Sequence, residues 1–159
     1  MAHLFSFYPN ILFKYDITLS IEYAIIEEKE VLMMQEIYWI NETRTNNFND
    51  REVAAKIGGL WQEAQKLQQT DATFYGIYAD YESDYKGDYT VSVASNMPHS
   101  ENAKKIMIPE QPYQVFNVEK EVFATWQEIW NTELHRSYLF DYEEYTPDGS
   151  IRIYVGLNA

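Results

Sequence analysis

A short internal repeat constrains the fold of this chain more than any other feature. The segment 60–64, Leu-Trp-Gln-Glu-Ala, is matched 65 residues later by Thr-Trp-Gln-Glu-Ile at 125–129. The same offset places Phe74 and Tyr75 on Leu139 and Phe140. Both Trp-Gln-Glu motifs fall in stretches whose apolar residues recur at helical spacing. Two copies of one supersecondary unit, at about 31–95 and 108–157, are therefore expected.

The predicted elements follow the same order, strand, helix, strand, strand, in both copies. In the first copy, β-branched and aromatic residues predict strands, a polar stretch predicts a loop, and Asn49 or Asp50 is the predicted helix cap. These elements are a strand over 31–40, a loop over 43–49, a helix that begins after the cap and continues to about residue 68, and strands over 74–81 and 88–95. The second copy is predicted to contain strand 113–118, a helix from 122 to about 134, and strands 139–145 and 150–157. The dipeptide Asp148-Gly149 predicts the turn of the last hairpin.

This order predicts an α+β fold made of two β-α-β-β modules in a pseudo-twofold arrangement, with antiparallel strands, one main helix per half and a ligand groove between the halves. Residues 21–159 are expected to form a single domain. Residues 1–20 are apolar, but they lack a basic beginning and are interrupted by Pro9, Lys14 and Asp16. We expect an N-terminal extension or an extra strand there, and neither a signal peptide nor a membrane span. Such a strand would allow pairing across a homodimer.

Composition excludes several classes of function. The chain has no cysteine, which rules out disulfides, thiolate zinc sites and cysteine nucleophiles. Its three histidines are far apart in sequence, so neither a metal site nor a cofactor is expected. The net charge of −13 repels phosphate backbones and attracts cations, and the pair Lys104-Lys105 is too small a basic patch for nucleic acid. An acidic cytoplasmic protein that needs its charge only for solubility is the alternative.

Aromatic residues and one glutamate mark a candidate binding site. In the strand 74–81, alternation places Tyr75, Ile77 and Tyr81 on one face, and Phe74, Gly76 and Tyr78 on the other. Gly76 leaves space for a ligand or another backbone, or it marks a bulge. The 65-residue offset places Glu143, which shares a strand face with Tyr145, on Tyr78. These two residues are predicted to line opposite walls of one groove, which would suit an organic cation. A solvated Glu143 is the alternative.

The second predicted helix carries two tryptophans one turn apart. Trp126 is predicted to lie in the core, because its counterpart Trp61 lies in a similar apolar stripe. Trp130 has Gln65 as its counterpart and is the better candidate to face a pocket.

Several motifs, taken in their order and spacing over about residues 25–157, resemble the gyrase-inhibitor-like effector-binding domain. The motifs are Gly59-Leu60-Trp61, Tyr75-Gly76-Ile77-Tyr78, Ile108-Pro109, Tyr113-Gln114-Val115-Phe116, Trp126-Gln127-Glu128-Ile129-Trp130, Leu134, Ser137-Tyr138, Tyr142-Glu143-Glu144-Tyr145 and Ile151-Arg152-Ile153-Tyr154-Val155. Domains of this family bind small molecules in AraC-type and MerR-type transcription activators. They also occur as free-standing proteins, including ones carried on integron gene cassettes.

The resemblance implies a ligand site between two related modules. In multidrug-binding members, a buried glutamate in the strand motif F-E-x-Y holds lipophilic cations among aromatic rings, and this glutamate corresponds to Glu143. Two positions depart from the family pattern: Tyr142 stands in place of Phe, and Gly156 in place of a proline near the end of the last strand. The expected ligand-binding residues are Glu143, Tyr78, Tyr113, Trp130, Tyr145, Tyr75 and Tyr154.

Three functions are compatible with these features. The first is a stand-alone sensor or sequestering protein for cationic, lipophilic or aromatic compounds, because no basic helix-turn-helix segment is present. The second, implied by the resemblance, is a hydrolase of strained electrophilic genotoxins, with Glu143 as the base and Tyr113 or Tyr145 as its partner. The third is an acidic protein that contacts DNA gyrase. The sequence lacks the common catalytic motifs GxSxG, GxxxxGK[ST] and HExxH, which favours binding over catalysis.

Overall fold

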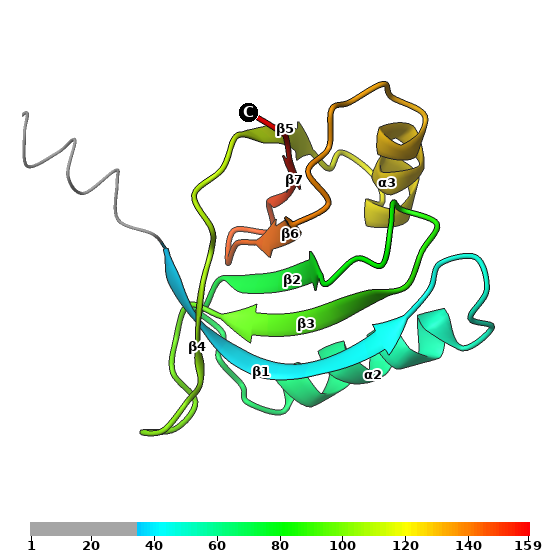
Figure 1. Cartoon of the computed structure of the whole chain (residues 1–159). Coiled ribbons are helices and arrows are strands. Elements are labelled where there is room, and N and C mark those ends of the chain that lie inside the picture. The colour runs from blue at the N-terminus through cyan, green and yellow to red at the C-terminus, as the bar shows by residue number, and fades with distance from the viewer. Residues whose placement is uncertain (1–34) are drawn as a thin grey trace, which may run out of the picture. The chain divides into compact units, whose positions relative to one another are not determined.

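The computed structural model describes residues 35–159, which form one seven-stranded sheet and two helices (Figure 1). The elements in chain order are β1 (Glu36–Thr45), α2 (Val53–Gln65), β2 (Phe74–Ala79), β3 (Tyr89–Ser95), β4 (Lys105–Met107), β5 (Tyr113–Asn117), α3 (Val122–Trp130), β6 (Phe140–Tyr145) and β7 (Ile151–Gly156). The strands lie in the order β4-β1-β3-β2-β6-β7-β5, and every neighbouring pair is antiparallel. The predicted α+β class is confirmed.

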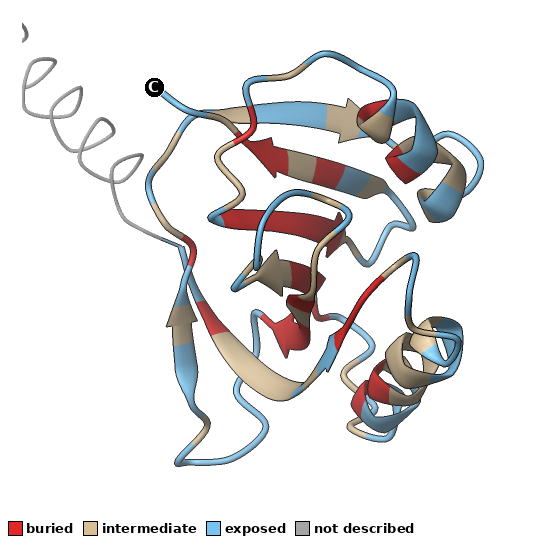
Figure 2. Cartoon of the chain, turned by 45° about the vertical axis from the view of Figure 1, so that its right-hand side comes forward, coloured by how far each residue is buried: buried red, intermediate tan, exposed pale blue. Residues whose placement is uncertain are grey.

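Both helices pack on the same face of the sheet (Figure 2). Leu60 and Ala64 of α2 pack against β3, whereas Trp126 and Ile129 of α3 pack against β7. The side chain of Tyr78 contacts both of these clusters, because β2 lies near the middle of the sheet. The space between the two helices is therefore lined by residues of the central strands.

The opposite face of the sheet carries a separate apolar cluster. The cluster consists of Ile37, Tyr75, Ile77, Ala94, Ile108, Phe140 and Tyr142. Strand alternation explains this division, since Tyr75 and Tyr78 differ by an odd number of positions and point to opposite faces. Within residues 35–159, no helix is long and apolar enough to cross a membrane.

The first strand is shifted relative to the sequence prediction. It was expected over 31–40, followed by a loop over 43–49, but β1 continues to Thr45. The reason is tertiary: the polar residues Thr43 and Thr45 pair with Val91 and Tyr89 of β3, and this pairing outweighs their loop-like composition. The short strand β4 was also missed. The predictions for residues 1–20 and for 31–34 lie outside the described residues.

The two helices are shorter than predicted, and Asp50 precedes the first one. The Asp50 carboxylate accepts hydrogen bonds from the Glu52 amide (2.9 Å) and Thr45 Oγ1 (2.7 Å), and it forms an ion pair with Lys56 (2.6 Å). These bonds hold the pKa of Asp50 down at about 2. Asp50 thus connects the end of β1 to the beginning of α2.

The turn after β2 changes the direction of one tyrosine. Tyr81 was predicted to share a face with Tyr75, but β2 ends at Ala79 and Asp80 adopts a positive φ of 50°. The strand alternation is lost at this residue. As a result, Tyr81 packs against Tyr89 with the residues of the helix-covered face. The predicted turn at Asp148-Gly149 is confirmed, and Gly149 has a φ of 88°.

Candidate functional site

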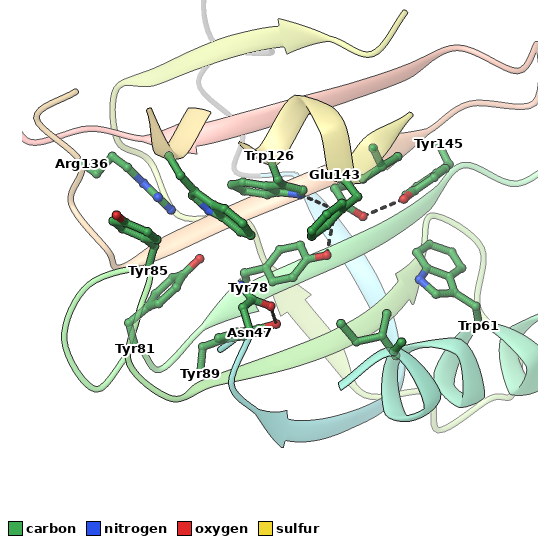
Figure 3. Close-up of a pocket in the computed structure, with 15 residues that line it drawn as sticks. Asn47, Trp61, Tyr78, Tyr81, Tyr85, Tyr89, Trp126, Arg136, Glu143 and Tyr145 are labelled. Atoms are coloured by element: carbon green, nitrogen blue, oxygen red, sulfur yellow. Dashed lines mark hydrogen bonds between the residues drawn. The ribbon is translucent and has the colours of Figure 1, made fainter. Parts of the chain in front are cut away.

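A buried glutamate lies on β6 at the centre of the helix-covered face. Glu143 is only 2% exposed, and three side chains donate hydrogen bonds to its carboxylate (Figure 3). Tyr78 Oη (2.7 Å) and Trp126 Nε1 (2.6 Å) donate to Oε1, and Tyr145 Oη (2.7 Å) donates to Oε2. The donors come from β2, α3 and β6, so the arrangement exists only in the folded chain.

The electrostatic environment of Glu143 is unusual for a carboxylate. Burial raises its pKa above the ordinary value, and the three hydrogen-bond donors offset this effect only in part. Among residues 35–159, no ion pair involves this side chain. Burial and the nearby carboxylate also raise the pKa of Tyr78 and Tyr145. Both hydroxyls therefore remain protonated and available as donors.

A glycine on the neighbouring strand provides the space for this carboxylate. Gly76 lies opposite Glu143 in the β2–β6 register. A Cβ atom at position 76 would lie 2.8 Å from Glu143 Oε2 and 3.3 Å from Trp61 Cζ2. Of the two interpretations of Gly76 from sequence, the structure therefore favours close approach, and what approaches are a carboxylate and an indole.

A cavity of about 260 Å³ lies next to Glu143, between α2 and α3. Most of its wall is aromatic and includes the stacked rings of Tyr85 and Trp130, whose centroids are 5.8 Å apart. The lining residues are Asn47, Ala54, Ile57, Trp61, Tyr78, Tyr81, Tyr85, Tyr89, Val122, Phe123, Trp126, Trp130, Arg136, Glu143 and Tyr145.

A buried ion pair lies at the end of the cavity away from Trp61 and Tyr145 (Figure 3). Arg136 Nη2 donates to Asp141 Oδ2 at 2.7 Å. Asp141 also accepts hydrogen bonds from the Tyr81 hydroxyl (2.7 Å) and from the Gly156 amide (2.7 Å). A proline, which the family resemblance implies near this position, has no amide hydrogen and could not donate this last bond.

The structure brings four of the seven predicted ligand-binding residues together. Glu143, Tyr78, Tyr145 and Trp130 all line the cavity. Tyr78 and Glu143 were expected on opposite walls, but they are hydrogen-bonded neighbours on adjacent strands.

The other three predicted residues lie on the opposite face of the sheet. Tyr75, Tyr113 and Tyr154 all have their rings next to Tyr142; the Tyr142 and Tyr154 rings are stacked at 4.4 Å. The Tyr113 hydroxyl donates to the Pro109 carbonyl and does not contact Glu143. The alternation of side chains along the strands determines this placement, which separates these tyrosines from the cavity next to Glu143.

Sequence reasoning missed several residues of the cavity. Tyr85 and Tyr89 belong to the β2–β3 hairpin, Arg136 follows α3, and Trp61 contacts Tyr145 edge to face at 4.7 Å. The signal for Trp61 was present in the repeat, but Trp61 and Trp126 were both assigned to the core. Trp126 is buried in the core and also donates to Glu143. In the part of the chain that the structure describes, His, Asp and Glu residues do not form a group of three able to hold a metal ion.

A family model for integron-associated effector-binding proteins matches residues 17–157. The chain belongs to this family. Membership in it indicates a small-molecule binding role, which agrees with the presence of a cavity lined by aromatic side chains.

Two known proteins extend this comparison. The crystal structure of the integron cassette protein VCH_CASS2, from the mobile metagenome of Vibrio cholerae, is similar with a TM-score of 0.64 and 27% sequence identity, covering 77% of this chain and 90% of that chain. The "Putative transcriptional regulator protein YobU" of Bacillus subtilis (strain 168) is 25% identical over 127 residues, which are 68% of this chain and 79% of that protein.

Proposed function

We propose that this effector-binding protein binds lipophilic organic cations in the aromatic cavity, with Glu143 as the charge that selects them, and that it acts as a sensor or a sequestering protein. The observation that carries the proposal is a fully buried carboxylate that has three neutral donors but no cationic partner among the described residues. A buried charge is costly unless it is paired. A cation entering the cavity would supply the missing charge.

The aromatic wall favours the same class of ligand. The negative faces of aromatic rings attract cations by about 0.5 to 2 kcal/mol per contact. Tyr78, Tyr89, Trp126 and Trp130 provide such rings around the cavity. Aromatic surface and a carboxylate together select a ligand that is both apolar and positively charged.

The hydrogen bonds of Glu143 restrict the kind of cation further. Oε1 already accepts from both Tyr78 and Trp126, and Oε2 accepts from Tyr145. Little acceptor capacity remains for a primary ammonium group, which carries three donors. Delocalised or alkylated cations need few acceptors and fit this site better. A rigid ligand of about 25 heavy atoms would gain roughly 7 to 8 kcal/mol, which corresponds to micromolar affinity.

The strand order supports a pseudo-twofold arrangement of two modules, with the ligand site at their junction. The strand order β1-β3-β2 is followed by β6-β7-β5. If β5, β6 and β7 are the counterparts of β1, β2 and β3, the second half of the sheet has the same order as the first half, read in the opposite direction. Ile77 and Tyr142, which are equivalent under the 65-residue offset, lie opposite each other in the β2–β6 register. A pseudo-twofold axis through this pair would make Tyr78 and Glu143 equivalent positions beside the axis.

The test compares two flat ligands that differ in charge. At pH 8, 9-aminoacridine is a delocalised cation and acridine is neutral, and both can be titrated by fluorescence. We expect the wild-type protein to prefer the cation, and Glu143→Gln to weaken cation binding more than about tenfold while leaving acridine nearly unaffected. Equal affinity of the wild type for both ligands would contradict the proposal.

Hydrolysis of a strained electrophile is a second candidate function, favoured by the hydrogen bond between Tyr145 and Glu143. Of the two tyrosines predicted as partners of the base, only Tyr145 contacts it. Formation of the diol from styrene oxide, lost in both Glu143→Ala and Tyr145→Phe, would establish this activity. Contact with DNA gyrase stays a prediction from the family resemblance.

A further inference from the structure

Arg136 is the second charged side chain of the cavity, and its hydrogen bonding is incomplete. The side chain is 4% exposed, and its guanidinium carbon lies 4.4 Å from the ring centroid of Tyr138 and 5.8 Å from that of Trp126. Among residues 35–159, only Nη2 of this guanidinium has a hydrogen-bond partner, the Asp141 carboxylate. Nε and Nη1 are buried and have no acceptor among the described residues.

The ion pair with Asp141 cannot satisfy these donors. Oδ1 of Asp141 accepts from the Gly156 amide, and Oδ2 accepts from both Tyr81 and Arg136 Nη2. A buried donor without an acceptor is costly, and charged donors are the most costly of all. Native structures leave few such groups, and each one requires an explanation. The position of Arg136 on the cavity wall suggests that a ligand supplies the acceptor.

We infer that the cavity contains a second subsite at Arg136, which takes a hydrogen-bond acceptor, a carbonyl or a carboxylate, on the same ligand whose cationic group lies at Glu143. This inference rests on the proposed function, because it assigns the two ends of one bound molecule. The ligand class is thus an elongated aromatic compound with a cation at one end and an acceptor at the other.

The arrangement of the wall supports two separate ends. Trp126 donates its Nε1–H to Glu143, whereas its ring lies next to the Arg136 guanidinium. In Figure 3 the Trp126 side chain lies between those of Arg136 and Glu143. A ligand that follows this indole meets a negative side chain at one end and a positive one at the other. Nε and Nη1 are buried in this structure, so the subsite requires the guanidinium to shift between the rings of Trp126 and Tyr138 and turn these two donors toward the cavity.

The pairing of Arg136 with Asp141 predicts which hydrogen-bond acceptors can bind at this subsite. Asp141 neutralises most of the Arg136 charge, because the two groups are 2.7 Å apart. The subsite therefore gains mainly from hydrogen bonds, and a neutral carboxamide should be accepted as well as a carboxylate. A cation without an acceptor leaves both donors unpartnered.

The experiment uses ligands with a permanent charge, measured by isothermal titration calorimetry on the full chain at pH 7.5. The first is the 4-(trimethylammonio)biphenyl cation; the others carry an additional 4′-carboxylate or 4′-carboxamide, and the series is repeated with one ring in place of two. In at least one of the two series, we expect the ligands with a carboxylate or carboxamide to bind at least about fivefold more tightly than the plain cation of the same length. Equal affinity at both lengths would overturn the inference.

Two variants assign the effect to Arg136. Arg136→Lys keeps a charge opposite Asp141 but lacks the planar set of donors, and the double variant Arg136→Met, Asp141→Asn removes both charges together. In each folded variant, the preference for the acceptor should fall below about twofold. Arg152→Lys is the matched control, since Arg152 pairs with Glu144 outside the cavity and should leave the preference unchanged. A preference that persists in both Arg136 variants would refute the subsite.

The outcomes also separate this inference from the proposed function. If Glu143→Gln does not weaken the plain cation, the proposed function fails. If Glu143→Gln weakens the plain cation but the acceptor brings no gain in the wild type, only the Arg136 subsite fails.

Discussion

Gly76 and Glu143 lie opposite each other on β2 and β6, and the missing side chain of the glycine leaves the space that the glutamate carboxylate occupies. Burial of the carboxylate, its raised pKa and its contact with the cavity all depend on this close approach. The relationship connects one small residue in a strand to the proposed chemistry of the site.

Gly76→Ala tests this relationship directly. The new methyl group would lie 2.8 Å from Glu143 Oε2 and 3.3 Å from the Trp61 ring, so the carboxylate and the indole must move. We expect a loss of about 1 to 3 kcal/mol in the free energy of unfolding, as for other overpacked sites, together with weaker cation binding. Urea denaturation and ligand titration measure the two effects.

Gly58→Ala is the control for this substitution. Gly58 lies inside α2, and a Cβ there meets no atom of the described residues within 4 Å, apart from the adjacent residues and the backbone of its own helix. The helix should be stabilised by about 0.5 to 1 kcal/mol, with no change in ligand affinity. A loss of binding in Gly58→Ala, or full binding in Gly76→Ala, would contradict the assigned role of Gly76.

The stability of the ligand-free protein should depend on pH through Glu143. Its folded-state pKa is raised above the ordinary value of 4.5, so the protonated side chain favours the fold at low pH, and this contribution is lost as the pH rises through the folded-state pKa. Glu143→Gln replaces the carboxyl group with an amide that does not titrate, so the variant does not lose stability in this way as the pH rises. We expect the Tm of the variant, relative to the wild type, to increase between pH 5 and pH 8. A difference in Tm that is constant over this range would show that the side chain does not titrate there.

Cation binding should release a proton from Glu143. A positive ligand favours the ionised carboxylate, so affinity should increase as the pH rises from about 4.5 through the folded-state pKa. A quaternary ammonium ligand has no titratable proton, and any proton released on binding belongs to the protein. Calorimetry in two buffers with different ionisation enthalpies measures this release. The same titration with Glu143→Gln should show none.

Two matched substitutions distinguish the two faces of the sheet. Tyr78→Phe removes a buried donor to Glu143, whereas Tyr154→Phe removes a hydroxyl that lies 3.5 Å from Glu144 on the other face. Loss of the Tyr78 hydrogen bond should cost about 1 to 3 kcal/mol in the free energy of unfolding and should change the pH dependence of binding. Tyr154→Phe should leave ligand affinity unchanged. If both variants bind alike, Tyr78 is not part of the ligand site.

Much of the fold was predictable because it depends on local patterns. Helical spacing around Trp61 and Trp126, strand alternation and the Asp148-Gly149 turn each depend on a few neighbouring residues. The resemblance pointed to Glu143, and the offset related it to Tyr78. Strand parity predicted that Glu143 and Tyr145 share a face, as the structure has them.

Other features were decided only by tertiary structure. The polar end of β1 is a strand because β3 pairs with it, and Tyr81 turns toward the cavity because Asp80 has a positive φ. No local pattern indicated that Arg136 would be buried beside Asp141, since the pair forms only when the segment after α3 packs against β6.

By itself, the sequence determined the class of fold and the order of all its elements except β4, because periodicity and repeat spacing are encoded locally. The resemblance of its motifs to a known family indicated Glu143 as the residue that carries the candidate site. The tertiary structure decided which aromatic rings surround that residue, which of them lie on the opposite face, and where the second charge lies. Those properties depend on the order of strands in the sheet and on contacts between residues far apart in the chain, such as Tyr78 with Glu143, and short-range patterns do not specify them.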